Sequence, residues 1–304
     1  IFYEARYLDS GSHVNILTGT MMLTAVGLLS ILSANGLTFL LTWVLIDIAE
    51  FLILVGIIKE TAKHRISIIS LLARFFGIIL MMSYLILRTP GSVLDVEKGN
   101  LSTGVLIIFI ALLRMGIIPL HIPYSEEPKI RRGIGSILRF LPILSVFSFL
   151  IFCGPQLFTK IQYGSTLTIV TTGVLFGALS WFFSRSELGG RPYWVFSFGC
   201  LALIAFLRGS MDALVGISIM MVVGGSVLFL FLPRKQKAGV LLPLILPVMF
   251  AIPFTPTAAI PLAIWGDRAE VANFFLLLSL TLLIGGVIRH SSRIEGKQKK
   301  LEDW

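Results

Sequence analysis

Ten long apolar segments, separated by short polar connections, limit the folds open to this sequence more than any other feature. A helix needs roughly 20 residues to cross a bilayer core about 30 Å thick. Of the 304 residues, 56% are apolar and only 13% are charged, which is outside the usual range of soluble domains. We therefore expect an all-α, multi-pass membrane helix bundle of about ten transmembrane helices. The expected spans lie near residues 14–34, 36–58, 66–88, 101–124, 135–155, 163–184, 191–208, 211–232, 238–265 and 270–288.

Basic residues gather in the connections of one side, and this asymmetry predicts the orientation of the chain. Cytoplasmic loops of membrane proteins carry the excess of Lys and Arg. That rule places the connections near 59–65, 129–132, 185–191 and 234–237 on the inner side, together with the basic tail 289–304 and hence the C-terminus. The net charge of +9 then indicates membrane orientation rather than nucleic-acid binding, because the basic residues are dispersed without interleaved aromatic residues. The expected surroundings are the lipid bilayer, with no nucleic-acid partner.

The fourth span contains Arg114 and, shortly after it, Pro119 and Pro123. A charge inside lipid costs at least about 2.5 kcal/mol, so such a residue usually faces a partner or a water-filled cavity. The two prolines predict a break or kink in the inner half of this span, because proline removes a helical hydrogen bond and clashes with the preceding turn. His121 lies within the expected break. An imidazole there is suited either to passing protons near neutral pH or to bonding a freed carbonyl.

Neighbouring spans carry charges at a similar depth. Asp47 and Glu50 are three residues apart in the second span, which puts both carboxylates on one helix face. At 1.5 Å per residue, Glu50, Arg74 and Arg114 each lie about 12 to 15 Å from the inner boundary. We expect a paired cluster near the middle of the bilayer, which either serves ion movement or only holds the helices together. Arg139 can reach this cluster or extend to the headgroups, and extension to the headgroups is the favoured alternative.

The second half of the chain differs from the first in the residues of its expected spans: it has prolines but lacks charges in the span cores. The cores of the spans from residue 163 onward contain no Asp, Glu, Lys, Arg or His. The region 238–265 contains five prolines, including Pro256 and Pro261, which predict a second broken helix. An odd number of crossings separates the two breaks, as in an inverted repeat. We therefore expect two inverted five-helix units, residues 14–155 with the intramembrane charges and residues 163–288 without them.

The residues around these breaks resemble the antiporter-like membrane subunits of respiratory complex I, a family shared with membrane-bound hydrogenases and multisubunit cation/proton antiporters. Family members carry a glutamate in one helix, a lysine five residues before the proline of a Pro-aromatic-His motif in a broken helix, and another basic residue in the next helix. Glu50 in Ala-Glu-Phe-Leu-Ile-Leu matches the glutamate, Arg114 occupies the lysine position, and Pro119-Leu120-His121 matches the proline-to-histidine step. Thr255-Pro256-Thr257-Ala258 is similar to the Ile-Pro-x-Thr-Ala run of the second broken helix.

The resemblance implies a membrane subunit of an energy-converting redox complex, in which electron transfer drives protons or other cations across the membrane. The implied partners are other membrane subunits and, through them, an electron-transfer arm. The implied location is a bacterial or archaeal plasma membrane or an organellar energy-converting membrane. Arginine stays charged where lysine can release a proton, so residue 114 is expected to modulate charge rather than to carry protons. The expected proton or ion path consists of Glu50, Asp47 and His121, and the expected charge-pair modulators are Arg114, Arg74 and Arg139.

Two further interpretations stay open. A degenerate structural or assembly subunit without pumping fits the arginine at position 114 and the absence of basic residues near Leu144 and Ile264, where the family has them. A stand-alone secondary transporter fits the broken helices of an inverted repeat. We expect no covalent catalysis, cofactor or metal in this chain, because no phosphate loop, nucleophile motif or metal-ligand spacing is present in the sequence. Cys153 and Cys200 are expected to be apolar packing residues within spans.

Overall fold

A computed structural model of the chain describes residues 13–57, 61–88, 101–117, 132–154, 160–231, 256–261 and 271–292. All regular structure within these ranges is helical, which confirms the all-α prediction. The α-helices are α1 (His13–Ile31), α2 (Gly36–Ile57), α3 (Thr61–Arg88), α4 (Leu101–Arg114), α5 (Arg132–Cys153), α6 (Lys160–Phe183), α7 (Glu187–Leu207), α8 (Met211–Ile219), α9 (Gly225–Phe231) and α12 (Val271–Ser292). A π-helical segment, η3 (Met220–Gly224), joins α8 to α9, and η4 (Pro256–Ala258) is a 3-10 turn.

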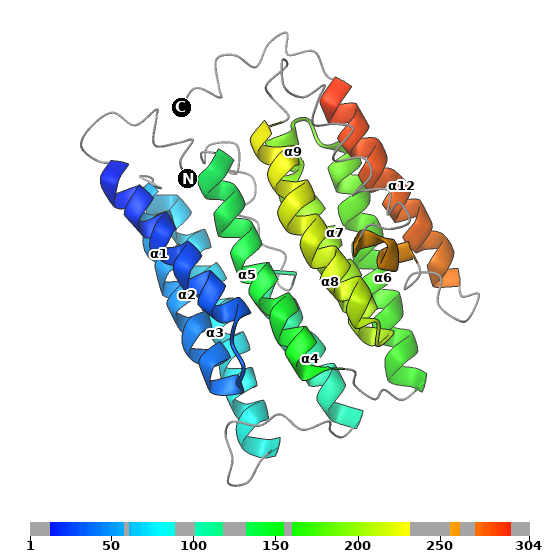
Figure 1. Cartoon of the computed structure of the whole chain (residues 1–304), viewed down its shortest axis with the longest axis horizontal. Helices are drawn as coiled ribbons and strands as arrows, with labels where there is room; N and C mark the ends of the chain where they lie inside the picture. The colour runs from blue at the N-terminus through cyan, green and yellow to red at the C-terminus, as the bar shows by residue number, and fades with distance from the viewer. Residues whose placement is uncertain are drawn as a thin grey trace. The chain divides into compact units, whose positions relative to one another are not determined.

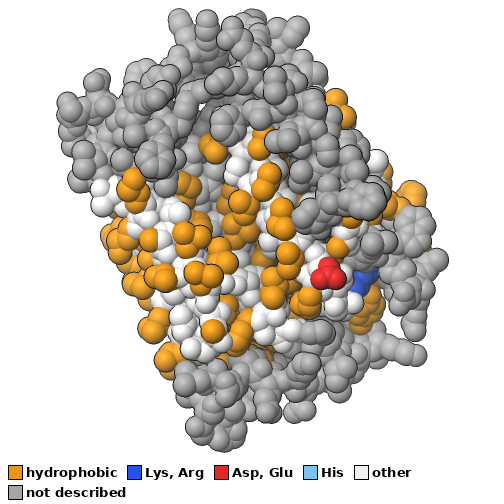
Figure 2. Space-filling model, viewed as in Figure 1, with side chains coloured by type: hydrophobic (Ala, Val, Ile, Leu, Met, Phe, Trp, Pro, Cys, Tyr) orange, Lys and Arg blue, Asp and Glu red, His pale blue; other side chains and the backbone are white. Residues whose placement is uncertain are grey.

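Seven helical segments of the described ranges are long and apolar enough to cross a membrane. Two shorter apolar helices, Thr18–Ile31 and Gly104–Arg114, accompany them. Apolar side chains dominate the described surface on the face seen in Figure 2, as expected for helices that contact lipid. These features are those of an integral membrane protein. Of the ninth expected span, 238–265, only residues 256–261 are described.

The first compact unit comprises Ile1–Ser125 and Gly133–Cys153, and its described helices are α1 to α5 (Figure 1). Helix α2 contacts both α1 and α3, and α3 contacts α4. The hydroxyl of Ser148 in α5 donates to the Ile31 carbonyl at the end of α1, at 2.7 Å. Aromatic rings fill the interior between α2 and α5, where the ring centroids of Trp43 and Phe149 are 5.1 Å apart. Helix α2 therefore packs against α1, α3 and α5 of this unit.

The second compact unit comprises Glu126–Arg132 and Gly154–Trp304. Helix α6 contacts α7 and α12, while α8 contacts η4. The indole nitrogen of Trp181 in α6 donates to the Leu283 carbonyl of α12 at 3.0 Å. A side chain at Gly286 would meet that indole, since an added Cβ would lie 2.2 Å from Trp181 Nε1. Near the ends of the same two helices, His290 Nε2 lies 3.0 Å from Ser184 Oγ. Helices α6 and α12 therefore pack at close range and are joined by polar contacts.

Candidate functional site in the first unit

A glycine ends the fourth helix directly after Arg114. Gly116 has a φ of 71°, a left-handed conformation that glycine adopts at little steric cost. Its amide donates to the Leu113 carbonyl at 3.2 Å, and the Ile117 amide donates to the Leu112 carbonyl at 2.9 Å. This pair of bonds is the Schellman arrangement, which satisfies carbonyls left open at a helix C-terminus. Arg114 therefore occupies the last turn of α4.

The fourth helix thus ends closer to Arg114 than the prolines predict. We expected the helix to continue toward Pro119 and Pro123, but α4 ends at Arg114 because Gly116 takes the left-handed position. Pro119, Pro123 and His121 lie outside the described residues. The described part of the span shows where α4 ends, and the expected break at the prolines stays a prediction.

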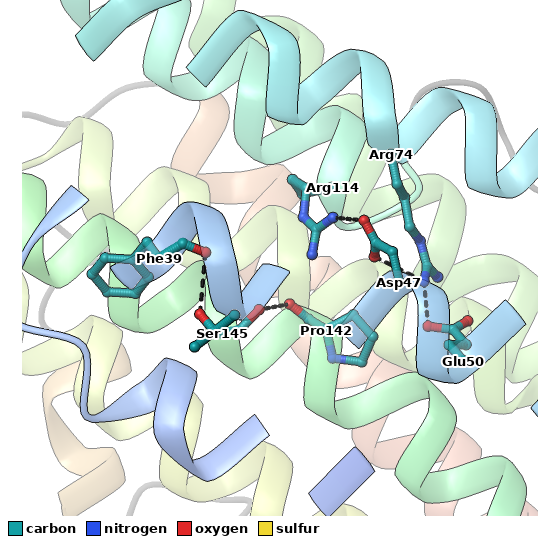
Figure 3. A network of polar contacts seen from close by, with 8 residues as sticks. Phe39, Asp47, Glu50, Arg74, Arg114, Pro142 and Ser145 are labelled. Carbon is teal, nitrogen blue, oxygen red and sulfur yellow. Dashed lines mark hydrogen bonds and ion pairs between the residues drawn. The ribbon is translucent and has the colours of Figure 1, made fainter. Parts of the chain in front are cut away.

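Four charged side chains of the first unit form one chain of ion pairs (Figure 3). Arg114 Nη1 donates to Asp47 Oδ2, and Arg74 Nη1 donates to Glu50 Oε2. Arg74 Nη1 also lies 3.7 Å from Asp47 Oδ1. The order along this ion-pair chain is therefore Arg114, Asp47, Arg74 and Glu50. Helix α2 supplies both carboxylates, α3 supplies Arg74 and α4 supplies Arg114, so the structure brings together the charges that the sequence places in one layer.

This ion-pair chain is buried and formally neutral. The side chains of Asp47 and Arg114 are both 0% exposed, and those of Arg74 and Glu50 are 7% and 4% exposed. Each ion removed from water loses several kcal/mol of solvation, and close pairing offsets part of that cost. Two carboxylates and two guanidinium groups balance one another. Removal of any one of them would leave an uncompensated charge in the interior.

Arg114 is held by two further residues that the sequence pattern did not single out. Its guanidinium carbon lies 4.6 Å from the centroid of the Trp43 ring, a cation–π contact that gains strength away from water. A Cβ added to Gly77 of α3 would lie 3.5 Å from Arg114 Cγ and Cδ, so the side chain packs directly against that glycine. Within the described residues, Arg114 Nε and Nη2 have no hydrogen-bond partner. Trp43 could have been found from its position four residues before Asp47, on the same helix face.

The other expected site residues lie in α5, in the second unit or outside the described ranges. Among the described residues, the ion pairs of the two carboxylates involve Arg74 and Arg114, and Arg139 lies half-buried in α5. In the second unit, Pro256 begins η4 and Pro261 ends the short helical stretch that follows it. In the ranges that the structure describes, no three His, Cys, Asp or Glu side chains are grouped as metal ligands would be.

The second unit buries one cation that the sequence pattern placed in a connection on the inner side. Arg191 lies within α7 and is 0% exposed, with its guanidinium carbon 5.9 Å from the Phe229 ring centroid. Helix α7 begins four residues earlier than position 191 because Ser186 caps it, accepting a bond from the Gly189 amide at 3.0 Å. The interior of the second unit therefore contains a buried charge at its α7 helix.

No protein-family model matches the chain, and a search of curated proteins gives no match either. The function of the chain is therefore inferred from the chemistry of the ion-pair chain and its position at the C-terminal end of α4.

Proposed function

We propose that this chain is a membrane subunit of a complex I-like energy-converting redox complex and contributes to proton or cation translocation coupled to electron transfer. The observation that carries the proposal is the buried ion-pair chain at the C-terminal end of α4. Ionisable groups inside a membrane are costly and typically mark ion paths. The family resemblance at Glu50, Arg114 and Pro119 favours the same kind of complex. The proposed partners are sister membrane subunits and an electron-transfer arm.

Switching of the ion pairs offers a way to load and release a proton. A carboxylate buried away from water favours its protonated form, whereas an adjacent cation favours the ionised form. Movement of Arg74 away from Glu50 would therefore favour proton uptake, and its return would favour release. Arg114 keeps its charge and acts through the field at Asp47. His121 is the proposed relay toward the inner side.

The proposed architecture has ten spans in two inverted five-helix units. Helix α4 ends at Arg114, shortly before Pro119, and the proline-rich region of the second unit contains the 3-10 turn η4. A pair of interrupted helices in corresponding positions of two halves is typical of inverted-repeat transporters. The basic connections and the basic tail favour an inner location for the C-terminus.

A structural subunit without pumping is the second candidate, and one observation favours it. All four members of the ion-pair chain are close-paired, as expected for charges that only hold α2, α3 and α4 together. Arginine at position 114 points the same way, because it cannot release a proton as the family's lysine can. The two candidates differ in whether ion movement depends on Glu50.

Glu50→Gln is expected to reduce the amount of assembled chain and to abolish ion movement by the chains that do assemble. The amide can accept the bond from Arg74, but it cannot exchange a proton. Inside-out vesicles from the native host, supplied with NADH or another soluble electron donor, would report proton uptake through a pH-sensitive fluorescent dye. The amount of chain recovered in the complex would be measured in the same vesicles.

The matched control is Asp212→Asn, which makes the same carboxylate-to-amide change at an exposed position of α8. We expect this variant to move protons at the wild-type rate. Wild-type proton uptake by assembled Glu50→Gln would exclude translocation through this cluster and leave the structural role.

A further inference from the structure

We infer that the two carboxylates of the ion-pair chain have different tasks: Glu50 exchanges the proton, and Asp47 is a positioning residue that serves as the permanent counter-ion of Arg114. This inference rests on the proposed function and refines it, since the sequence assigns both carboxylates to the ion path. Three differences between the two ends of the ion-pair chain support it: the burial of the side chains, the number of cationic partners of each carboxylate, and the packing around each arginine.

Burial separates the two pairs. The side chains of Asp47 and Arg114 are both 0% exposed, whereas Arg74 and Glu50 are 7% and 4% exposed. A group that exchanges protons must reach a donor or acceptor outside its own pair. All four side chains are buried, and the pair formed by Arg74 and Glu50 is slightly less enclosed than the pair formed by Arg114 and Asp47.

The number of cationic partners also differs. Asp47 lies between two guanidinium groups, with Oδ2 accepting from Arg114 and Oδ1 lying 3.7 Å from Arg74 Nη1. Glu50 stands at the end of the chain, where its described ion pair is with Arg74. Burial favours the protonated form of a carboxylate, and two nearby cations oppose that effect more strongly than one does. Departure of Arg74 would remove the described ion pair of Glu50 but would leave Asp47 paired with Arg114.

Packing fixes Arg114 in place. Trp43 of α2 covers the guanidinium at 4.6 Å, and the aliphatic stem meets Gly77 of α3, where an added Cβ would lie 3.5 Å from it. The helix also ends beside it through the left-handed Gly116. Residues of α2 and α3 thus hold the Arg114 side chain in place, and Asp47 neutralises its charge. A fixed, neutralised arginine at this position explains how a site of this kind can function without a lysine there.

Two neutral double variants test the division of tasks. Asp47→Asn with Arg114→Gln removes one pair, and Glu50→Gln with Arg74→Gln removes the other, each leaving the cluster formally neutral. We expect the first double variant to assemble and to keep a reduced proton uptake in inside-out vesicles, because Glu50 and Arg74 stay paired while the fixed pair beside them is lost. We expect the second to assemble with proton uptake lost. Asp47→Asn alone should greatly reduce the amount of assembled chain, because it leaves Arg114 enclosed without its counter-ion.

The possible outcomes distinguish this inference from the function on which it rests. Loss of proton uptake in assembled Asp47→Asn/Arg114→Gln would overturn the inference and leave translocation through the cluster intact. Wild-type uptake in both double variants would overturn the proposed function itself.

A chemical measurement on the unaltered chain covers the case in which a double variant does not fold. Dicyclohexylcarbodiimide reacts with protonated carboxyl groups in apolar surroundings, and peptide mass spectrometry locates the adduct. We expect the adduct on Glu50. An adduct on Asp47 would overturn the inference.

Discussion

Replacing Arg114 with glutamine is expected to destabilise the first unit by about 3–5 kcal/mol, the usual cost of breaking a buried ion pair. The change leaves Asp47 fully enclosed with Arg74 at 3.7 Å as its described cationic neighbour. The chain of pairs would then carry two negative charges and one positive charge. Thermal unfolding of the purified chain in detergent, compared with wild type, measures the loss.

Arg114→Lys is the matched control for this prediction. Lysine keeps the positive charge and is long enough to approach Asp47, although it lacks the planar fork of a guanidinium. We expect a much smaller loss of stability than with glutamine. If the Arg114→Gln and Arg114→Lys variants both unfold at the wild-type temperature, the charge of Arg114 contributes nothing to the stability of the unit.

Trp43→Ala is expected to cost about 3–5 kcal/mol, the range typical of deleting a large buried aromatic side chain. Trp43 is 0% exposed, and its ring centroid lies 6.1 Å from that of Phe39 and 5.1 Å from that of Phe149. The same ring covers the guanidinium of Arg114, so the variant also removes a cation–π contact. The unfolding temperature in detergent again provides the measurement.

Trp43→Phe keeps an aromatic face over Arg114 and most of the apolar volume. We expect this variant to retain most of the stability that Trp43→Ala loses. A phenylalanine variant as unstable as the alanine variant would contradict this view, because it would assign the role to the indole N–H rather than to packing and the ring face.

The helices themselves could be predicted from the sequence because long apolar segments have few alternatives in a membrane. The layer of charges was also predictable, since Asp47 and Glu50 are three residues apart and the depths of Arg74 and Arg114 follow from counting residues. Depth alone does not specify partners. Which carboxylate faces which arginine depends on how each helix is rotated about its axis, and tertiary packing decides that rotation.

The position of the helix break was harder to predict. Both Gly116 and Pro119 can end a helix, and the proline is the stronger signal in a sequence. Gly116 acts first because the Schellman arrangement needs a left-handed residue two positions after Arg114. The expected span that corresponds to α7 began at residue 191, so Arg191 was predicted to lie in the preceding connection. The cap at Ser186 starts α7 early and brings the arginine inside the helix.

The assignment to a redox-driven membrane complex depends on which proteins accompany this chain. Native membranes would be solubilised gently, the chain isolated through a tag, and its companions identified by mass spectrometry. We expect stoichiometric companions with iron–sulfur or quinone-site sequence signatures, together with further multi-pass membrane subunits. Isolation of the chain alone, or as a homo-oligomer, would contradict the assignment.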